Sequence, residues 1–73
     1  MKINLDTKRL LCPMPVIRLG EAIEKIEAGD TIQVTATDPG VLHDIPAWCK
    51  VHGHKVIEID EKTDEIILIV EKQ

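Results

Sequence analysis

Residues 31–40 read TIQVTATDPG, and this stretch decides how the rest of the chain folds. Apolar Ile32, Val34 and Ala36 alternate with polar residues, which is the two-residue period of a strand with one buried face. The DPG at residues 38–40 is typical of a turn. A strand of this kind needs a hydrophobic layer over its apolar face, and the segments on both sides of it have the pattern to supply one.

The segment before this strand has the pattern of an amphipathic helix. From Pro15 onward, apolar residues recur at helical spacing with charged residues opposite them, and Gly29 supplies a stop signal. The members of the apolar stripe are Val16, Leu19, Ile23 and Ile26. We expect this helix to lie on the sheet through that stripe.

A second helix is predicted after residues 38–40. Pro46 would break a continuous helix starting at Pro39, because proline has no N–H to donate in a helix interior. Asp44 as a cap, followed by an early Pro46, would begin a helix cleanly. The sequence therefore predicts an initial turn and then a helix that ends near Gly53.

Three further segments read as strands: residues 2–6, residues 55–60 and residues 65–71, with the polar EKTD at residues 61–64 joining the last two as a hairpin. The resulting order is βαβαββ. It predicts an α+β fold, a two-layer α/β sandwich in which both helices pack on one face of a four-stranded mixed sheet. A chain of 73 residues has room for one small hydrophobic core, so we expect a single domain over residues 1–73.

The last predicted strand is apolar on both faces, because residues 66–70 read IILIV. Either Ile67 and Ile69 or their alternates should therefore project from the face that the helices leave open. Such a patch would suit a partner or a second copy of the chain. A central strand with a few exposed apolar residues is the alternative.

The composition argues against several classes of function. Thirteen acidic and nine basic residues give a net charge of -4, which disfavours nucleic-acid binding, since that depends on neutralising phosphates. Trp48 is the sole aromatic residue, so base-stacking platforms are lacking. Residues 1–7 do not resemble a signal peptide, and no apolar stretch is long enough to span a membrane. We expect a cytoplasmic protein that binds neither nucleic acids nor membranes directly.

The segment CPMP at residues 12–15 contains the candidate reactive residue, Cys12. Proline is at home in the first position of a helix, so Pro13 marks a helix start and places Cys12 at its N-cap. Free backbone N–H groups and the helix dipole favour the thiolate there, which predicts a lowered pKa and a reactive cysteine. Pro13 and Pro15 also stiffen the segment. The alternative is that Cys12 is a small buried apolar residue.

Three other segments accompany this one: DPG at residues 38–40, DIPAWC at residues 44–49 and HGH at residues 52–54. Together, in this order and over essentially the whole chain, the four segments resemble the TusA (SirA-like) sulfur-carrier family, whose hallmark is Cys-Pro-x-Pro. The order of helices and strands also matches. A four-residue motif alone would be a weak signal, whereas the set is strong.

The resemblance implies a sulfur carrier protein. The family's cysteine accepts sulfane sulfur from a cysteine desulfurase or another donor, holds it as a persulfide and passes it to a downstream acceptor protein. Members serve tRNA 2-thiouridine modification, molybdenum cofactor synthesis or sulfur oxidation. By this likeness Cys12 bears the sulfur, Pro13 and Pro15 shape its presentation, and we expect a monomer with no cofactor and no independent turnover. A thiol-based interaction or redox-regulatory module is the alternative.

The chain departs from the family in the loop before the motif, where members usually carry a glycine and this chain has Lys8-Arg9-Leu10-Leu11. A different loop conformation or an added positive charge could change which donor docks. Lys8 and Arg9 either tune the thiol and attract an acidic partner or are solvated loop charges.

The end of the second predicted helix contains Trp48, Cys49 and two histidines. Trp48 is either a lid on the edge of the core or a docking anchor. Cys49 falls on the apolar stripe of the second helix, which favours packing over a role as a resolving thiol for Cys12. His52 and His54 with Cys49 do not have a zinc-site spacing, so no metal is expected.

Overall fold

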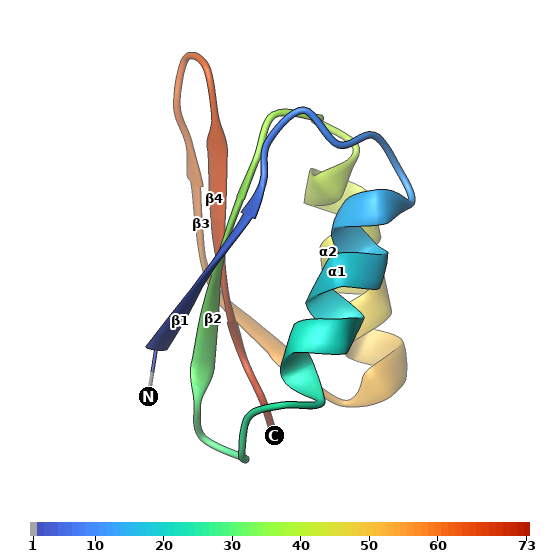
Figure 1. Cartoon of the computed structure of the whole chain (residues 1–73), viewed down its shortest axis with the longest axis vertical. Helices are drawn as coiled ribbons and strands as arrows, with labels where there is room; N and C mark the ends of the chain where they lie inside the picture. Colours follow the sequence, from blue (N-terminus) through green and yellow to red (C-terminus); the bar gives the residue numbers. More distant parts are fainter. Residues whose placement is uncertain (1) are drawn as a thin grey trace.

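The computed structural model describes residues 2–73. Its elements, in chain order, are β1 (Lys2–Thr7), α1 (Met14–Ile23), β2 (Thr31–Ala36), α2 (Val41–His52), β3 (Lys55–Glu61) and β4 (Ile66–Glu71). The strands form one sheet in the order β1-β2-β4-β3, with β1 parallel to β2 and the other neighbours antiparallel. Both helices lie on the same face of this sheet (Figure 1). The predicted two-layer α+β fold of order βαβαββ is confirmed.

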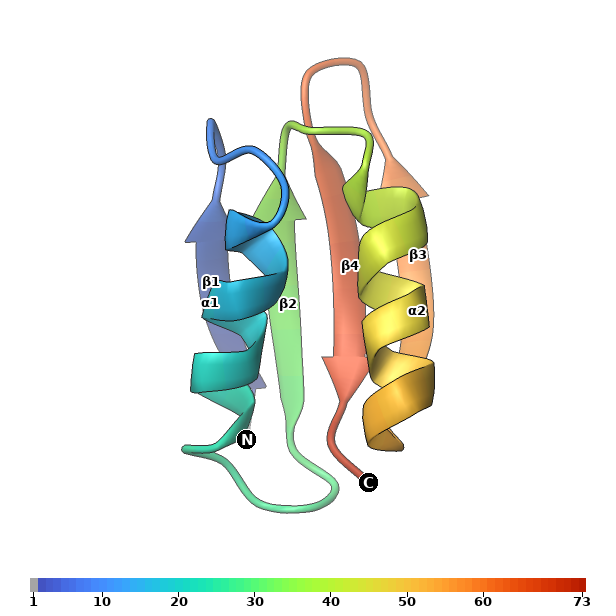
Figure 2. The same cartoon turned by 90° about the vertical axis from the view of Figure 1, so that its right-hand side faces the viewer.

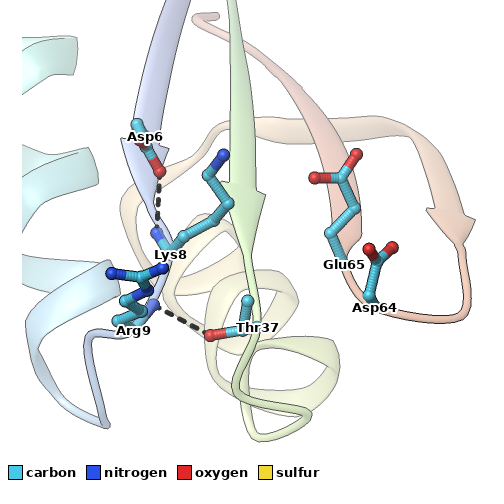
Figure 3. Close-up of a pocket in the computed structure, with 6 residues that line it drawn as sticks. All are labelled: Asp6, Lys8, Arg9, Thr37, Asp64 and Glu65. Carbon is cyan, nitrogen blue, oxygen red and sulfur yellow. Dashed lines mark hydrogen bonds between the residues drawn. The ribbon is translucent and has the colours of Figure 1, made fainter.

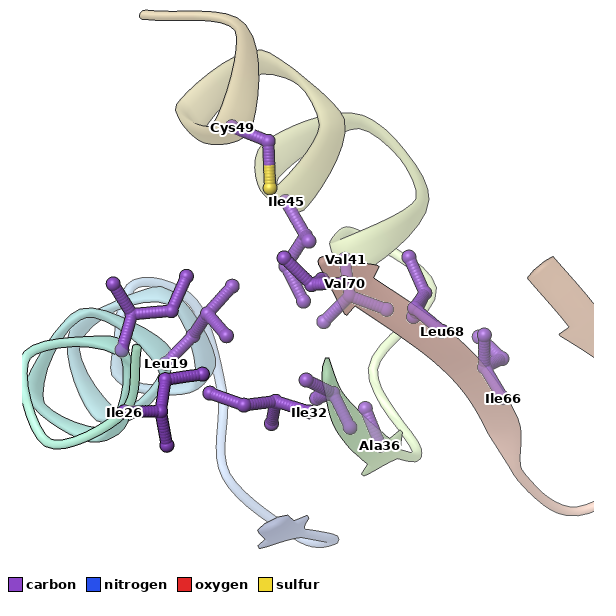
Figure 4. Packing of buried hydrophobic residues seen from close by; sticks show 12 residues of the cluster. Leu19, Ile26, Ile32, Ala36, Val41, Ile45, Cys49, Ile66, Leu68 and Val70 are labelled. Atoms are coloured by element: carbon purple, nitrogen blue, oxygen red, sulfur yellow. The ribbon is translucent and has the colours of Figure 1, made fainter. Parts of the chain in front are cut away.

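The core lies between the sheet and the two helices. Ile32 of β2 pairs with Val70 of β4, and Val34 pairs with Leu68, so these side chains share one face, and all four are fully buried. The helices cover them with Leu19 and Ile23 from α1 and with Val41, Ile45 and Cys49 from α2 (Figure 4). The predicted alternation of buried residues in β2 is confirmed.

The open face of the sheet carries the alternate residues of β4. Ile67 and Ile69 are half-buried there, and their partners in register are Thr35 and Gln33 on β2. Asp60 and Glu58 lie opposite them on β3. The two apolar side chains of β4 on this face therefore have polar partners in register on both neighbouring strands.

Helix α1 begins one residue later than the sequence predicts. Pro13 is its N-cap and not its first helical residue, because the Pro13 carbonyl accepts the N–H of Ile17 at 3.1 Å while a turn bond joins the Met14 N–H to the Leu11 carbonyl at 2.8 Å. The prediction that Cys12 is the N-cap is therefore wrong. The peptide bond between Cys12 and Pro13 is cis.

The C-terminal end of α1 lies at Ile23, well before Gly29. Ile26 is nevertheless buried, so the apolar stripe continues beyond the helix. The ammonium of Lys72 donates to the carbonyls of Ile23 at 2.8 Å and Ile26 at 2.7 Å. These bonds occupy carbonyls that the end of a helix leaves without intrahelical partners.

Helix α2 runs without interruption from Val41 to His52 and contains Pro46, so the prediction of a start at Asp44 is wrong. The helix starts earlier because the turn before it is already bonded: the Gly40 N–H donates to Asp38 Oδ1 at 3.1 Å, and the Asp44 N–H donates to the Gly40 carbonyl at 2.9 Å. Pro46 removes a single bond of this ladder. The end was predicted well, since Gly53 is the C-cap and has a φ of 78°.

Both helices point the same way, so their N-terminal ends lie at the same end of the molecule (Figure 2). The loop from β1 to α1 and the turn from β2 to α2 meet there. Within residues 2–73, neither helix combines the length and the apolar character needed to cross a membrane.

Candidate functional site

Cys12 is exposed and lies at the meeting point of the two helix starts. Its backbone N–H donates to Asp38 Oδ2 at 3.1 Å, across a sequence separation of 26 residues. The other oxygen of the same carboxylate accepts the Gly40 N–H at 3.1 Å. Asp38 therefore forms a bridge: one carboxylate holds the main chain at Cys12 against the first turn of α2.

The thiol of Cys12 has a raised pKa, and the prediction of a lowered pKa is wrong. The main cause is a hydrogen bond with the Asp44 carboxylate, followed by partial loss of hydration and then by the negative charges of Asp44 and Asp38. Each of these effects favours the neutral thiol over the thiolate.

The helix start also offers the sulfur fewer donors than the sequence suggests. Pro13 and Pro15 have no N–H, and the Met14 N–H is already bonded to the Leu11 carbonyl. The free N–H groups that usually stabilise a thiolate at a helix N-terminus are therefore missing from its first positions. From the sequence, Asp38 and Asp44 are predicted only as a turn residue and a cap residue. The segments DPG and DIPAWC that contain them were the signal that could have placed them near the thiol.

The two prolines of the motif have different surroundings. Pro15 is the second residue of α1 and is fully buried, so it fixes the start of the helix to the core. Pro13 is exposed next to Cys12. Leu11, on the other side of Cys12, is 72% exposed, so the thiol is flanked by apolar surface.

Lys8 and Arg9 line a polar cavity of about 560 Å³ between the end of β1 and the β3–β4 hairpin (Figure 3). The Lys8 N–H donates to Asp6 Oδ1 at 2.9 Å, and the Arg9 N–H donates to Thr37 Oγ1 at 2.9 Å. Carboxylates from the hairpin, Asp64 and Glu65, line the other side. The charges that shift the Cys12 pKa are those of the two aspartates, so these cations do not offset them.

Arg9 has a φ of 69°, a backbone conformation that glycine adopts at little cost and that other residues adopt at a cost of about 1 kcal/mol or more. The loop thus contains the kind of position for which glycine is suited, with an arginine in it. The bond to Thr37 holds this conformation in place.

The chain matches the family model described as "Sulfurtransferase TusA" over residues 3–72. The chain belongs to the TusA family. YrkI of Bacillus subtilis is 38% identical over 68 residues, which cover 93% of this chain and 91% of YrkI. The sulfur carrier protein TusA of Pseudomonas putida is 33% identical over 69 residues, covering 94% of this chain and 86% of that protein.

A solved structure supports the same assignment. The crystal structure of a SirA-like protein from Desulfitobacterium hafniense superposes with a TM-score of 0.84 at 25% sequence identity, covering 97% of this chain and 96% of that one. The TusA-family fold is therefore shared over nearly the full length of both chains.

Trp48 of this TusA-family chain lies in the groove between the two helices. It is half-buried and packs on the core, and its ring lies 4.4 Å from the ring of His52 and 5.7 Å from that of His54, measured between centroids. A Cβ added at Gly20 of α1 would come within 3.3 Å of the Trp48 ring, so the helices meet closely here. Gly20 is nearly two turns from the start of α1, which places the indole away from the helix starts where Cys12 lies. The structure therefore places Trp48 over the edge of the core. A docking role for Trp48 stays a prediction.

Cys49 is buried in the core with its sulfur among aliphatic side chains (Figure 4), as its predicted packing role requires. Burial raises the pKa of this thiol to about 11, so it is protonated at neutral pH. Within the described residues 2–73, no cluster of three or more histidine, cysteine, aspartate or glutamate side chains could hold a metal ion.

Proposed function

We propose that this protein carries sulfur as a persulfide on Cys12. It accepts sulfane sulfur from a cysteine desulfurase or a similar donor and passes it to a downstream acceptor protein. The observation that carries this proposal is the exposed thiol of the CPMP segment in a chain of the TusA family, some of whose members are named sulfur carrier proteins.

The two transfers need an accessible sulfur atom and its thiolate form. In uptake, Cys12 Sγ attacks the terminal sulfur of the donor persulfide; the S–S bond of the donor breaks, the donor leaves as a thiol, and a new S–S bond forms on Cys12. In release, a thiolate of the acceptor attacks the terminal sulfur, and Cys12 returns to a thiol. No net oxidation occurs in either step, so no cofactor is required.

The loop that bears Cys12 suits two successive partners. The thiol is exposed, the flanking Leu11 and Pro13 are exposed apolar residues, and the buried Pro15 anchors the loop. The same carrier chemistry serves tRNA 2-thiouridine modification, molybdenum cofactor synthesis and sulfur oxidation, because these pathways differ in the donor and acceptor. We place the protein in the cytoplasm as a monomer.

A redox-regulatory module is the weaker reading of the same thiol. Redox-sensing cysteines are accessible and have a low pKa, because the thiolate is the form that oxidants attack. Cys12 is accessible, but its pKa is raised. Because sulfur transfer also uses the thiolate, the raised pKa does not separate the two functions, and membership of the TusA family is what favours the carrier.

The proposal is tested by intact mass after incubation with a cysteine desulfurase and L-cysteine. Wild type and Cys49→Ser should gain the mass of one sulfur atom, which a reductant removes, and Cys12→Ser should gain none. If the wild type gains no sulfur from several desulfurases or from inorganic polysulfide, the carrier function is wrong.

A further inference from the structure

Exposed apolar side chains flank Cys12 where the chain enters α1. The stretch LLCPMPVI at residues 10–17 has no charged residue, although 30% of the residues of the whole chain are charged. Leu11 and Pro13, on either side of the thiol, are exposed, and Ile17 is 46% exposed. A single exposed leucine is ordinary, whereas exposed apolar side chains gathered at one place usually mark a binding surface.

The main chain gathers these side chains at the start of α1. The Met14 N–H donates to the Leu11 carbonyl at 2.8 Å, so a tight turn joins Leu11 to the helix. The Ile17 N–H donates to the Pro13 carbonyl at 3.1 Å, which places Ile17 one turn after Pro13 on the same side of the helix. We call Leu11, Pro13 and Ile17 the thiol patch. The buried residues of α1 face the sheet, so the exposed patch lies on the outer side of the helix, which is turned towards the viewer in Figure 2.

Charged groups border the thiol patch but are not part of it. Lys8 and Arg9 line the polar cavity of Figure 3, opposite carboxylates of the β3–β4 hairpin. Asp38 and Asp44 are half-buried on the α2 side of the thiol, and Arg18 is exposed on α1. The three side chains of the patch can bind only by burying apolar area, so the surface that covers them must be apolar too.

We propose that the thiol patch is the docking surface for the protein that loads Cys12, a cysteine desulfurase that presents an apolar surface around its own persulfide cysteine. This proposal rests on the proposed carrier function. The structure holds Cys12 as a free thiol, which is the form that a donor meets. An acceptor meets the persulfide instead, and the additional sulfur atom then stands between the acceptor and the patch.

Sulfur transfer brings this donor onto the patch. In uptake, Cys12 Sγ bonds to the terminal sulfur of the donor persulfide, the S–S bond of the donor breaks, and the donor leaves as a thiol. An S–S bond is only about 2 Å long, so the donor residues around the donor cysteine must come into contact with Leu11 and Pro13. Ile17 extends the contact along α1. Each apolar side chain that becomes covered in this complex strengthens docking.

The test compares two donors on wild type, Leu11→Ser, Ile17→Ser and Val51→Ser, with uptake followed by intact mass at limiting carrier concentration. One donor is a cysteine desulfurase with L-cysteine; the other is inorganic polysulfide, which is too small to cover the patch. The readout is the ratio of the two uptake rates, because a change in the reactivity of the thiol itself cancels in it. Val51→Ser is the matched control, since Val51 is 81% exposed in the last turn of α2, at the other end of the molecule.

The ratio of desulfurase uptake to polysulfide uptake should fall about tenfold in Leu11→Ser, and by a smaller factor in Ile17→Ser, which is less exposed. It should stay at the wild-type value in Val51→Ser. Unchanged ratios in both patch variants overturn the proposal, and so does an equal fall in the control. A wild-type dimer in sedimentation that Ile17→Ser dissociates also overturns it, because a second copy would then cover the patch.

The docking surface and the carrier function fail in different ways. If the wild type gains sulfur from polysulfide and the ratios do not change, or if no desulfurase loads it, the docking surface alone is refuted. If the wild type gains sulfur from neither donor, the carrier function fails, and the docking proposal fails with it.

A second measurement covers the case in which a patch variant does not fold, as judged by circular dichroism. Salt does not weaken apolar docking, whereas docking that depends on Lys8, Arg9 or Arg18 weakens as the ionic strength rises. The same ratio of uptake rates is therefore measured for the wild type at low and high salt. A fall of less than about threefold supports the proposal, and a larger fall overturns it, because charges would then dominate docking.

Discussion

Removing the Asp38 carboxylate should destabilise the protein by an amount that the structure allows one to work out. Its Oδ1 accepts the Gly40 N–H at the start of α2, a bond comparable to a helix cap and worth about 1 kcal/mol. Its Oδ2 accepts the N–H of exposed Cys12, and a charge-assisted bond in contact with water is worth about 1 kcal/mol more. Asp38→Ala should therefore cost about 2 kcal/mol, and Asp38→Asn, which keeps one acceptor oxygen, about half of that.

Thermal unfolding followed by circular dichroism measures this difference. For a domain of this size 1 kcal/mol shifts the Tm by about 4–8 °C, so Asp38→Ala should melt roughly 8–16 °C below the wild type and Asp38→Asn roughly 4–8 °C below it. Asp60→Ala, on the exposed face of β3, is the control and should melt near the wild-type temperature. An Asp38→Ala variant with the wild-type Tm would show that the bridge contributes nothing to stability.

Three further predictions test other parts of the structure. Leu68→Ala should lower the free energy of unfolding by about 2–5 kcal/mol, because Leu68 is fully buried in a central strand. Ile67→Ala, on the open face, should lower it clearly less. Urea unfolding that ranks the two variants in the opposite order would contradict the assignment of the two faces. Arg9→Gly should raise the Tm by several degrees, because it removes the strain of a positive φ, which costs about 1 kcal/mol. A lower Tm would show that the guanidinium stabilises the fold by more than this strain costs. Burial raises the folded-state pKa of Cys49 from 9.0 to about 11. The stability that comes from its neutral thiol is therefore fully present below pH 9 and is lost as the pH rises towards 11. Urea unfolding at successive pH values should show this decline in the wild type and not in Cys49→Ala.

The strands and the layering were predictable because they depend on local alternation. Residues 31–37 alternate strictly, and β2 buries the three apolar side chains that the pattern selects. Local alternation does not decide which face of β4 is buried, because residues 66–70 are apolar throughout. Only the pairing of β4 with β2 decides that Ile67 and Ile69 lie on the open face.

The start of α2 and the chemistry of the thiol were predicted wrongly for a common reason. Local rules assign Asp44 to a cap and Cys12 to an electropositive helix start. In the structure Asp38 takes the role of bonding the turn before α2, and both aspartates approach Cys12 from a distant part of the chain. Contacts across so many residues depend on how the helices pack side by side, which no local pattern records.

The two hydrogen bonds that Asp38 accepts restrict which residues can replace it during evolution. A residue that only starts a helix can be exchanged among serine, threonine, asparagine and aspartate with modest loss. Asp38 must also reach the main chain at Cys12 with its second oxygen, and none of the other three offers two acceptor oxygens. Proteins that keep a cysteine in this loop should therefore show few substitutions of the aspartate at the turn before α2, even though the turn alone would tolerate several.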